Sequence, residues 1–159
     1  MKRTKLLVIM SILCAVSLLA MILALKGTKP VPVFSPPPFE ENAQIGIPPV
    51  GKEQGYEELD ATWFRIGLCG VIRQRNGLAE VWFSNPDSND VWLKLRILDE
   101  NGNILGQSGI LRPGEYVHQI QLTQMPEEGS AVIMKVMAYE PESYHSAGAV
   151  ELHTVVDVE

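Results

Sequence analysis

The feature of this sequence that most restricts its fold is an apolar stretch of twenty uncharged residues near the amino terminus. The stretch covers residues 6–25 and follows a short basic start, residues 1–5. A helix of this length rises roughly 30 Å, about the hydrocarbon thickness of a bilayer. We therefore expect residues 6–25 to form a transmembrane helix that contacts the lipid bilayer and crosses it once.

A cleaved signal peptide and a lipid anchor are the alternatives to a permanent anchor. The apolar part of a signal peptide is usually about 7 to 15 residues long and ends in small residues. Here Ala24 has the bulky Ile22 two positions before it, which is a poor cleavage site. A lipid anchor on Cys14 needs a small preceding residue, and that residue is Leu13. The sequence favours an uncleaved anchor.

The positive charges that flank the apolar stretch predict its orientation. Lys2, Arg3 and Lys5 precede it, whereas Lys26 and Lys29 follow it. Flanking cations favour the cytoplasmic side of a membrane. The larger number of cations before the apolar stretch predicts a single-pass protein of the cell membrane, with residues 1–5 in the cytoplasm and the C-terminal domain extracellular.

The part of the chain beyond the helix is strongly acidic. All 19 Asp and Glu residues follow residue 39, whereas five of the 13 Lys and Arg residues precede residue 30. The remaining eight cations leave residues 30–159 with a formal net charge of −11. Such a domain repels a phosphate backbone, so we expect no nucleic-acid partner.

Residues 26–58 are rich in proline and lack apolar periodicity. They contain seven of the 11 prolines in the chain. Proline fixes its own φ angle and restricts the residue before it, which favours locally extended chain. We interpret this segment as an extracellular Pro-rich linker. A proline-rich ligand for an aromatic groove is the alternative.

Residues 59–159 carry the pattern of an all-β domain. Short apolar runs alternate with polar residues, as in 79–83 and 91–98, and turn-forming residues such as Asn101-Gly102 separate them. The pattern predicts seven or eight strands and no long helix. We expect an immunoglobulin-like antiparallel β-sandwich without the disulfide of that class, because Cys69 is the one cysteine in this range.

Three turn-rich segments carry a resemblance to a known group of proteins. They are residues 83–90 (FSNPDSND), 105–109 (LGQSG) and 112–115 (RPGE). Together they resemble a pattern in small membrane-anchored surface proteins of Gram-positive bacteria, over about 75 residues. The resemblance implies an immunoglobulin-like outer domain at the cell surface and supports no catalytic activity.

The sequence contains no recognisable catalytic constellation. His118, His145 and His153 are isolated and lack the spacing of a helical zinc site. Cys69 lies in an apolar run, where we expect it to be buried and where a thiol is poorly activated. We therefore expect neither an enzyme nor a cofactor.

The loop at residues 85–90 is a candidate calcium site. Asp87, Asn89 and Asp90 offer the oxygen ligands that Ca²⁺ prefers. The same residue types also form turns by bonding to their own backbone. We favour ordinary turn formation and keep these three residues as a metal-site hypothesis.

Two tryptophans are the candidate binding residues. If residues 79–83 and 91–97 pair as a hairpin, a register with Val81 opposite Leu93 also places Trp82 opposite Trp92 on the polar face. Such a pair would form an apolar patch for a partner. Consecutive strands that cross to opposite sheets would separate them, and this alternative stays open.

These observations predict a non-enzymatic, membrane-anchored module for binding or display. We expect it to recognise a protein or a glycan at the cell surface. The alternative is an accessory subunit of a membrane-spanning secretion or conjugation complex, in which the helix itself makes contacts.

Overall fold

The structure, a computed structural model, describes residues 2–27 and 34–158. It divides into two compact units, Met1–Ser35 and Pro36–Glu159. Residues 28–33 of the predicted linker lie outside the described residues.

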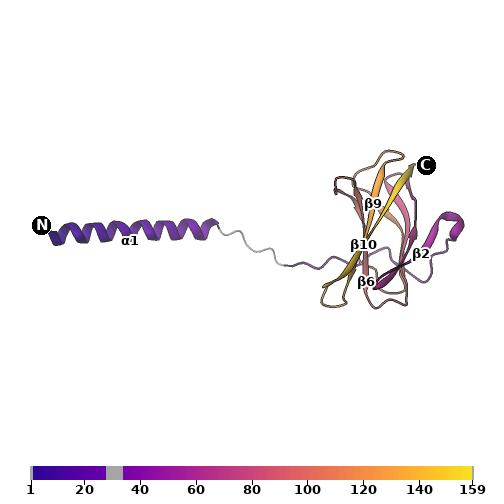
Figure 1. Cartoon of the computed structure of the whole chain (residues 1–159), viewed down its shortest axis with the longest axis horizontal. Coiled ribbons are helices and arrows are strands. Elements are labelled where there is room, and N and C mark those ends of the chain that lie inside the picture. Colours follow the sequence, from indigo (N-terminus) through magenta and orange to yellow (C-terminus); the bar gives the residue numbers. More distant parts are fainter. Residues whose placement is uncertain (1, 28–33, 159) are drawn as a thin grey trace. The chain divides into compact units, whose positions relative to one another are not determined.

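The first unit contains helix α1 (Lys2–Gly27), which includes the predicted apolar helix (Figure 1). The segment Arg3–Ile22 has a mean hydropathy of 2.5, and it is the one candidate membrane span in the described part of the chain. A membrane span and an N-terminal signal sequence both fit this length and composition.

The second unit is built from β-strands, which confirms the predicted β-sandwich class. The strands are β1 (Gln44–Ile45), β2 (Tyr56–Ala61), β3 (Phe64–Cys69), β4 (Ile72–Arg75), β5 (Leu78–Asn85), β6 (Trp92–Asp99), β7 (Ile104–Gln107), β8 (Glu115–Gln121), β9 (Ala131–Tyr139) and β10 (Ser146–Val158). A short 3₁₀ turn, η1 (Lys52–Gln54), precedes β2.

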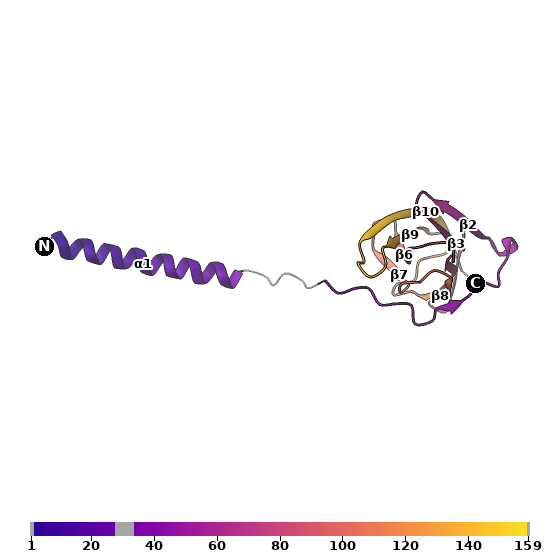
Figure 2. The ribbon, with the colours of Figure 1, turned by 90° about the horizontal axis from the view of Figure 1, so that it is seen from below.

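The strands form one curled sheet whose two halves face each other. Their order is β1-β8-β5-β4-β10-β9-β6-β7, and the β2–β3 hairpin joins β5 through the pair Gly67 and Ser84. Strand β10 links the halves, because it pairs antiparallel with β9 and its last residues pair parallel with β4. Viewed along the strands, β9, β6 and β7 lie on one side and β3 and β8 on the other (Figure 2).

The core lies between these two layers and confirms the predicted inner faces. Val81 and Phe83 of β5 and Leu93 and Leu95 of β6 are fully buried. Cys69 is also buried, as the sequence predicts. Alternate residues of each strand face one side of a sheet, so the apolar set of each strand packs inward.

Strands β5 and β6 do not pair as a hairpin, and they follow the alternative in which consecutive strands cross to opposite layers. Strand β5 pairs with β8, β4 and β3, whereas β6 pairs with β7 and β9. The loop between them carries the chain from one layer to the other. Buried Asn85 fixes this crossing, because its Nδ2 donates hydrogen bonds to the carbonyls of Val91 (2.8 Å) and Leu111 (3.0 Å).

Residues 36–50, here called the strap, lie in the predicted linker but belong to the sandwich unit. The backbone N–H of Ile110 donates to the carbonyl of Pro38, and the N–H of Glu40 donates to the carbonyl of Ile110, both at 2.9 Å. Strand β1 then pairs with β8. The compact unit therefore starts at Pro36 rather than at residue 59. Main-chain hydrogen bonds hold the strap, and they require no apolar periodicity in the sequence.

Candidate recognition pocket

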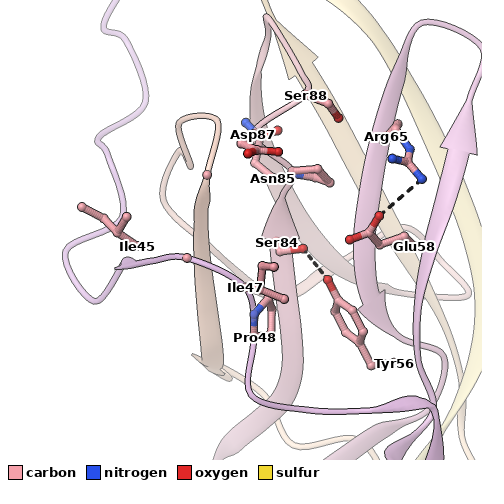
Figure 3. A pocket seen from close by; sticks show the side chains of 13 residues that line it. Ile45, Ile47, Pro48, Tyr56, Glu58, Arg65, Ser84, Asn85, Asp87 and Ser88 are labelled. Atoms are coloured by element: carbon pink, nitrogen blue, oxygen red, sulfur yellow. Dashed lines mark hydrogen bonds and ion pairs between the residues drawn. The ribbon is translucent and has the colours of Figure 1, made fainter.

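An open pocket with a volume of about 340 Å³ lies between the strap and the β2–β3 hairpin (Figure 3). Residues 45–48 of the strap form one side, and β2 and β3 contribute the other. Residues 84–88, at the end of β5 and the start of the next loop, and Gly114 complete the lining. Segments far apart in the sequence therefore build this pocket.

The side chains of Tyr56 and Ser84 meet in the lining of the pocket. The two hydroxyl oxygens are 2.8 Å apart, and both residues are buried. The tyrosine reaches Ser84 across Gly67, where an added Cβ would collide with both hydroxyl groups. Burial raises the pKa of Tyr56, and the hydrogen bond between Tyr56 and Ser84 opposes part of this increase.

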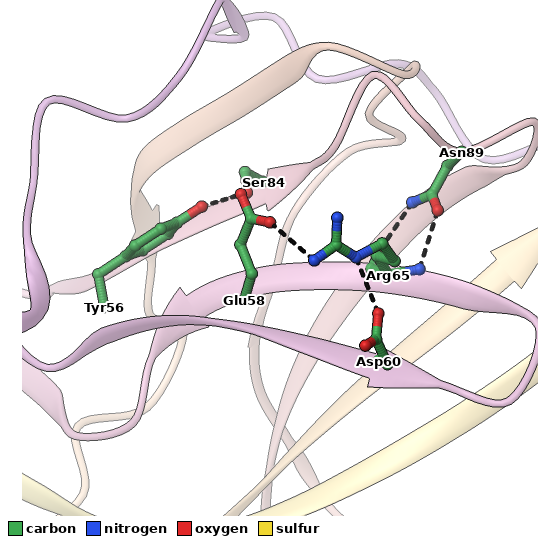
Figure 4. Close-up of polar contacts among 6 residues, drawn as sticks. All are labelled: Tyr56, Glu58, Asp60, Arg65, Ser84 and Asn89. Carbon is green, nitrogen blue, oxygen red and sulfur yellow. Dashed lines mark hydrogen bonds and ion pairs between the residues drawn. The ribbon is translucent and has the colours of Figure 1, made fainter.

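The hairpin side of the pocket carries an ion-pair group (Figure 4). The guanidinium of Arg65 lies 3.3 Å from a carboxylate oxygen of Glu58 and 2.8 Å from one of Asp60. The side chain of Asn89 also bonds to the backbone N–H and carbonyl of Arg65, at 2.8 and 2.7 Å. These bonds join the β2–β3 hairpin to the loop that follows β5.

The strap side of the pocket is apolar and exposed. Ile45 is 90% exposed and Ile47 is 85% exposed. Gly46 between them has φ +117°, a backbone conformation that favours glycine, and its N–H donates to the carbonyl of Gly114 at 2.9 Å. Tyr116 of β8 also holds the strap, because its hydroxyl donates to Gln44 at 2.6 Å. The two isoleucines are thus presented on a fixed backbone.

The structure separates the two tryptophans that a hairpin register would bring together. Trp82 lies at a β-bulge, with φ +45°, and stacks on His118 with ring centroids 3.8 Å apart. Its indole N–H donates to Glu80 at 2.7 Å. The Nε2 atom of His118 lies 3.5 Å from the same carboxylate, buried and without a hydrogen bond. The β-bulge interrupts the regular alternation of β5 and redirects the side chain of Trp82.

Trp92 belongs to a second aromatic cluster, on β6. Its ring packs edge-on against Phe39 of the strap, at 4.9 Å, and against Tyr144, at 5.2 Å. The guanidinium of Arg112 lies 3.7 Å from the centre of the Phe39 ring. Because Trp82 and Trp92 lie in different layers, they form no common patch, and a binding role for either remains a prediction.

The three residues of the metal-site hypothesis have different surroundings. Asp87 lines the pocket, Asn89 bonds to Arg65 and to Asn85, and Asp90 is exposed. Among the described residues, no three His, Cys, Asp or Glu side chains gather as a metal site. The amide of Asn89 already stabilises the loop, and calcium binding at this loop remains a prediction.

Several pocket residues were not candidates in the sequence analysis because they lie in the predicted linker or a plain strand. They are Ile45, Ile47, Tyr56, Glu58 and Arg65. The alternation of Glu58 and Asp60 with Leu59 and Ala61 was a usable signal for a strand. No sequence signal shows that the strap lies beside this strand.

Comparisons with known proteins add little to this geometry. The sequence matches no family model, and the search of curated proteins gives no match either. Among solved structures, the protein is similar to CopC from Methylosinus trichosporium OB3b, with 13% sequence identity and a TM-score of 0.36. The alignment covers 65% of this chain and 95% of that one. A likeness at this level supports no inference about function.

Proposed function

We propose that the protein is a non-enzymatic recognition module. Helix α1 anchors it in the cell membrane as a single-pass protein, and an immunoglobulin-like sandwich lies outside the cell. The module recognises a protein or a glycan at the cell surface through the pocket between the strap and the β2–β3 hairpin.

The observation that carries this proposal is the exposure of Ile45 and Ile47 at the edge of a pocket that also contains charged and hydroxyl side chains. Two nearly fully exposed isoleucines gain nothing from folding, since burial of such a side chain stabilises by roughly 1.5–3 kcal/mol. A concave surface that combines exposed apolar side chains with a few polar groups is typical of a surface that a partner covers.

Two further observations support the absence of catalysis and of a nucleic-acid partner. In the described lining, the carboxylate of Glu58 is paired with Arg65, and neither histidine nor cysteine contributes. The net charge of −11 beyond residue 30 opposes contact with a polyanion. The basic start of the chain supports the outward orientation of the sandwich.

A photo-cross-linking amino acid at position 47 of the full chain in intact cells tests the proposal. We expect a discrete adduct from this position and none from position 149, which is exposed on β10 in the other layer. Adducts that are equal from both positions, or absent from both, would contradict recognition through the pocket.

Exchange of α1 for an unrelated membrane helix tests the alternative of an accessory subunit. A recognition module keeps the adduct at position 47 after the exchange, because its contacts lie in the sandwich. A subunit that assembles through its helix loses the adduct.

A further inference from the structure

The charges around the pocket are unbalanced. Arg65 is the one cation in its described lining, and Glu58 and Asp60 both pair with it. The carboxylate of Asp87 also lines the pocket and has neither an ion pair nor a hydrogen bond among the described residues. These four side chains carry a formal net charge of −2. The pocket therefore attracts a cation, and Asp87 is free to pair with it.

The strap requires that a ligand make apolar contacts in addition to carrying a positive charge. Ile45 and Ile47 are both exposed and flank the same pocket. A ligand that satisfies the whole surface has a positive group and, within a few ångströms, apolar groups that cover the isoleucines. An extended peptide with alternating side chains meets both requirements, because residues two apart share a face.

We propose, on the basis of the function proposed above, that the pocket takes an extended segment of a partner protein that carries a lysine or arginine. The cationic side chain pairs with Asp87, and apolar side chains of the segment cover Ile45 and Ile47. A neutral glycan leaves Asp87 without a partner, and an anionic glycan meets repulsion from the acidic domain, so a basic peptide is the better complement.

Binding of short synthetic peptides to the full chain in lipid nanodiscs tests this inference. The probe is the capped seven-residue peptide Thr-Val-Thr-Lys-Thr-Val-Thr, in which the central lysine and the two valines share one face of an extended chain. Two matched peptides carry glutamine or glutamate at the centre. We expect the lysine peptide to bind most tightly and the glutamate peptide least tightly, and the preference to weaken as salt is added.

Two single-charge variants locate the contact. Asp87→Asn should weaken binding of the lysine peptide about three- to fivefold, as expected for an exposed ion pair. Asp90→Asn removes the same charge from the same loop, outside the pocket lining, and should leave the affinity nearly unchanged. Ile47→Ser should weaken all three peptides alike, because it removes apolar contact and no charge.

The inference is overturned if the glutamine peptide binds as tightly as the lysine peptide, or if the two Asp variants weaken binding equally. It is also overturned if no peptide binds while the adduct at position 47 persists. In that last case the proposed recognition function still stands, with a glycan or a folded surface as its ligand. Loss of the adduct itself would contradict the proposed function.

Discussion

The hydroxyl of Tyr56 lies 2.8 Å from the hydroxyl of Ser84, across the backbone of Gly67. This contact connects the edge strand β2 to β5, although β2 pairs directly only with β3. Both residues line the candidate pocket. The packing of the β2–β3 hairpin against β5, beside the pocket, therefore depends on the missing side chain of Gly67.

Substitution of that glycine should destabilise the sandwich. In Gly67→Ala the new Cβ collides with the hydroxyls of Tyr56 and Ser84, so the tyrosine has to leave its site. We expect a loss of roughly 1–3 kcal/mol in the free energy of unfolding, as for other overpacked sites. Gly51→Ala is the control, because its Cβ has ordinary contacts. Equal stability of both variants, measured by thermal denaturation, would rule out a tight Tyr56 site.

Tyr56 also predicts a dependence of stability on alkaline pH. Its folded-state pKa is raised above the ordinary value of 10.0, mainly by burial. The unfolded chain therefore loses this proton first, and the stabilisation present below pH 10 declines as the pH rises through the folded-state pKa. Tyr56→Phe should reduce this alkaline decline in the unfolding free energy. An identical decline in the variant and the parent would refute the assignment.

The strap predicts which fragment of the chain is stable. A fragment of residues 36–159 should melt at a higher temperature than one of residues 59–159, which lacks β1 and half of β2. Both should show β-type circular dichroism. Equal melting temperatures would mean that the strap adds no stability. A large shift with added calcium would instead support the metal site at Asp87, Asn89 and Asp90.

Lys94 should be a source of instability. It is 5% exposed, has no ion-pair partner among the described residues, and its pKa is lowered by burial and then by Arg96. The unfolded chain therefore binds this proton more tightly, so stability should increase with pH above the folded-state pKa. Lys94→Met should raise the unfolding free energy by roughly 1 kcal/mol. Chemical denaturation at neutral pH measures the change, and a less stable variant would reveal a role for the charge.

The predicted orientation has a direct test. A thiol reagent that does not cross membranes should label Ser35→Cys in intact cells. The parent chain is the control, and it should react weakly. Cys69 is buried and burial raises the pKa of its thiol, whereas Cys14 lies within the expected membrane span, which the reagent does not enter. Labelling that appears only after permeabilisation would place the sandwich on the cytoplasmic side.

The local features of this protein can be predicted from its amino-acid sequence. The uncharged run predicted α1, and the alternation in β5 and β6 predicted which apolar side chains are buried, although it did not predict the burial of Lys94. The Asn101-Gly102 turn between β6 and β7 was also predicted, from its residue types. In the structure the carboxylate of Asp99 stabilises this turn, because it accepts hydrogen bonds from nearby backbone N–H groups. Each of these features depends on contacts between residues close in the chain.

The choice of neighbouring strands and the residues of the pocket depend on tertiary contacts. Alternation marks the apolar face of β5 but not whether β6 or β8 pairs with it, because backbone hydrogen bonds are the same in either case. The strap is held in a similar way by main-chain bonds and by single contacts such as Phe39 on Trp92. The pocket joins Ile47, Arg65 and Asp87, whose proximity follows from long-range packing and from no local pattern.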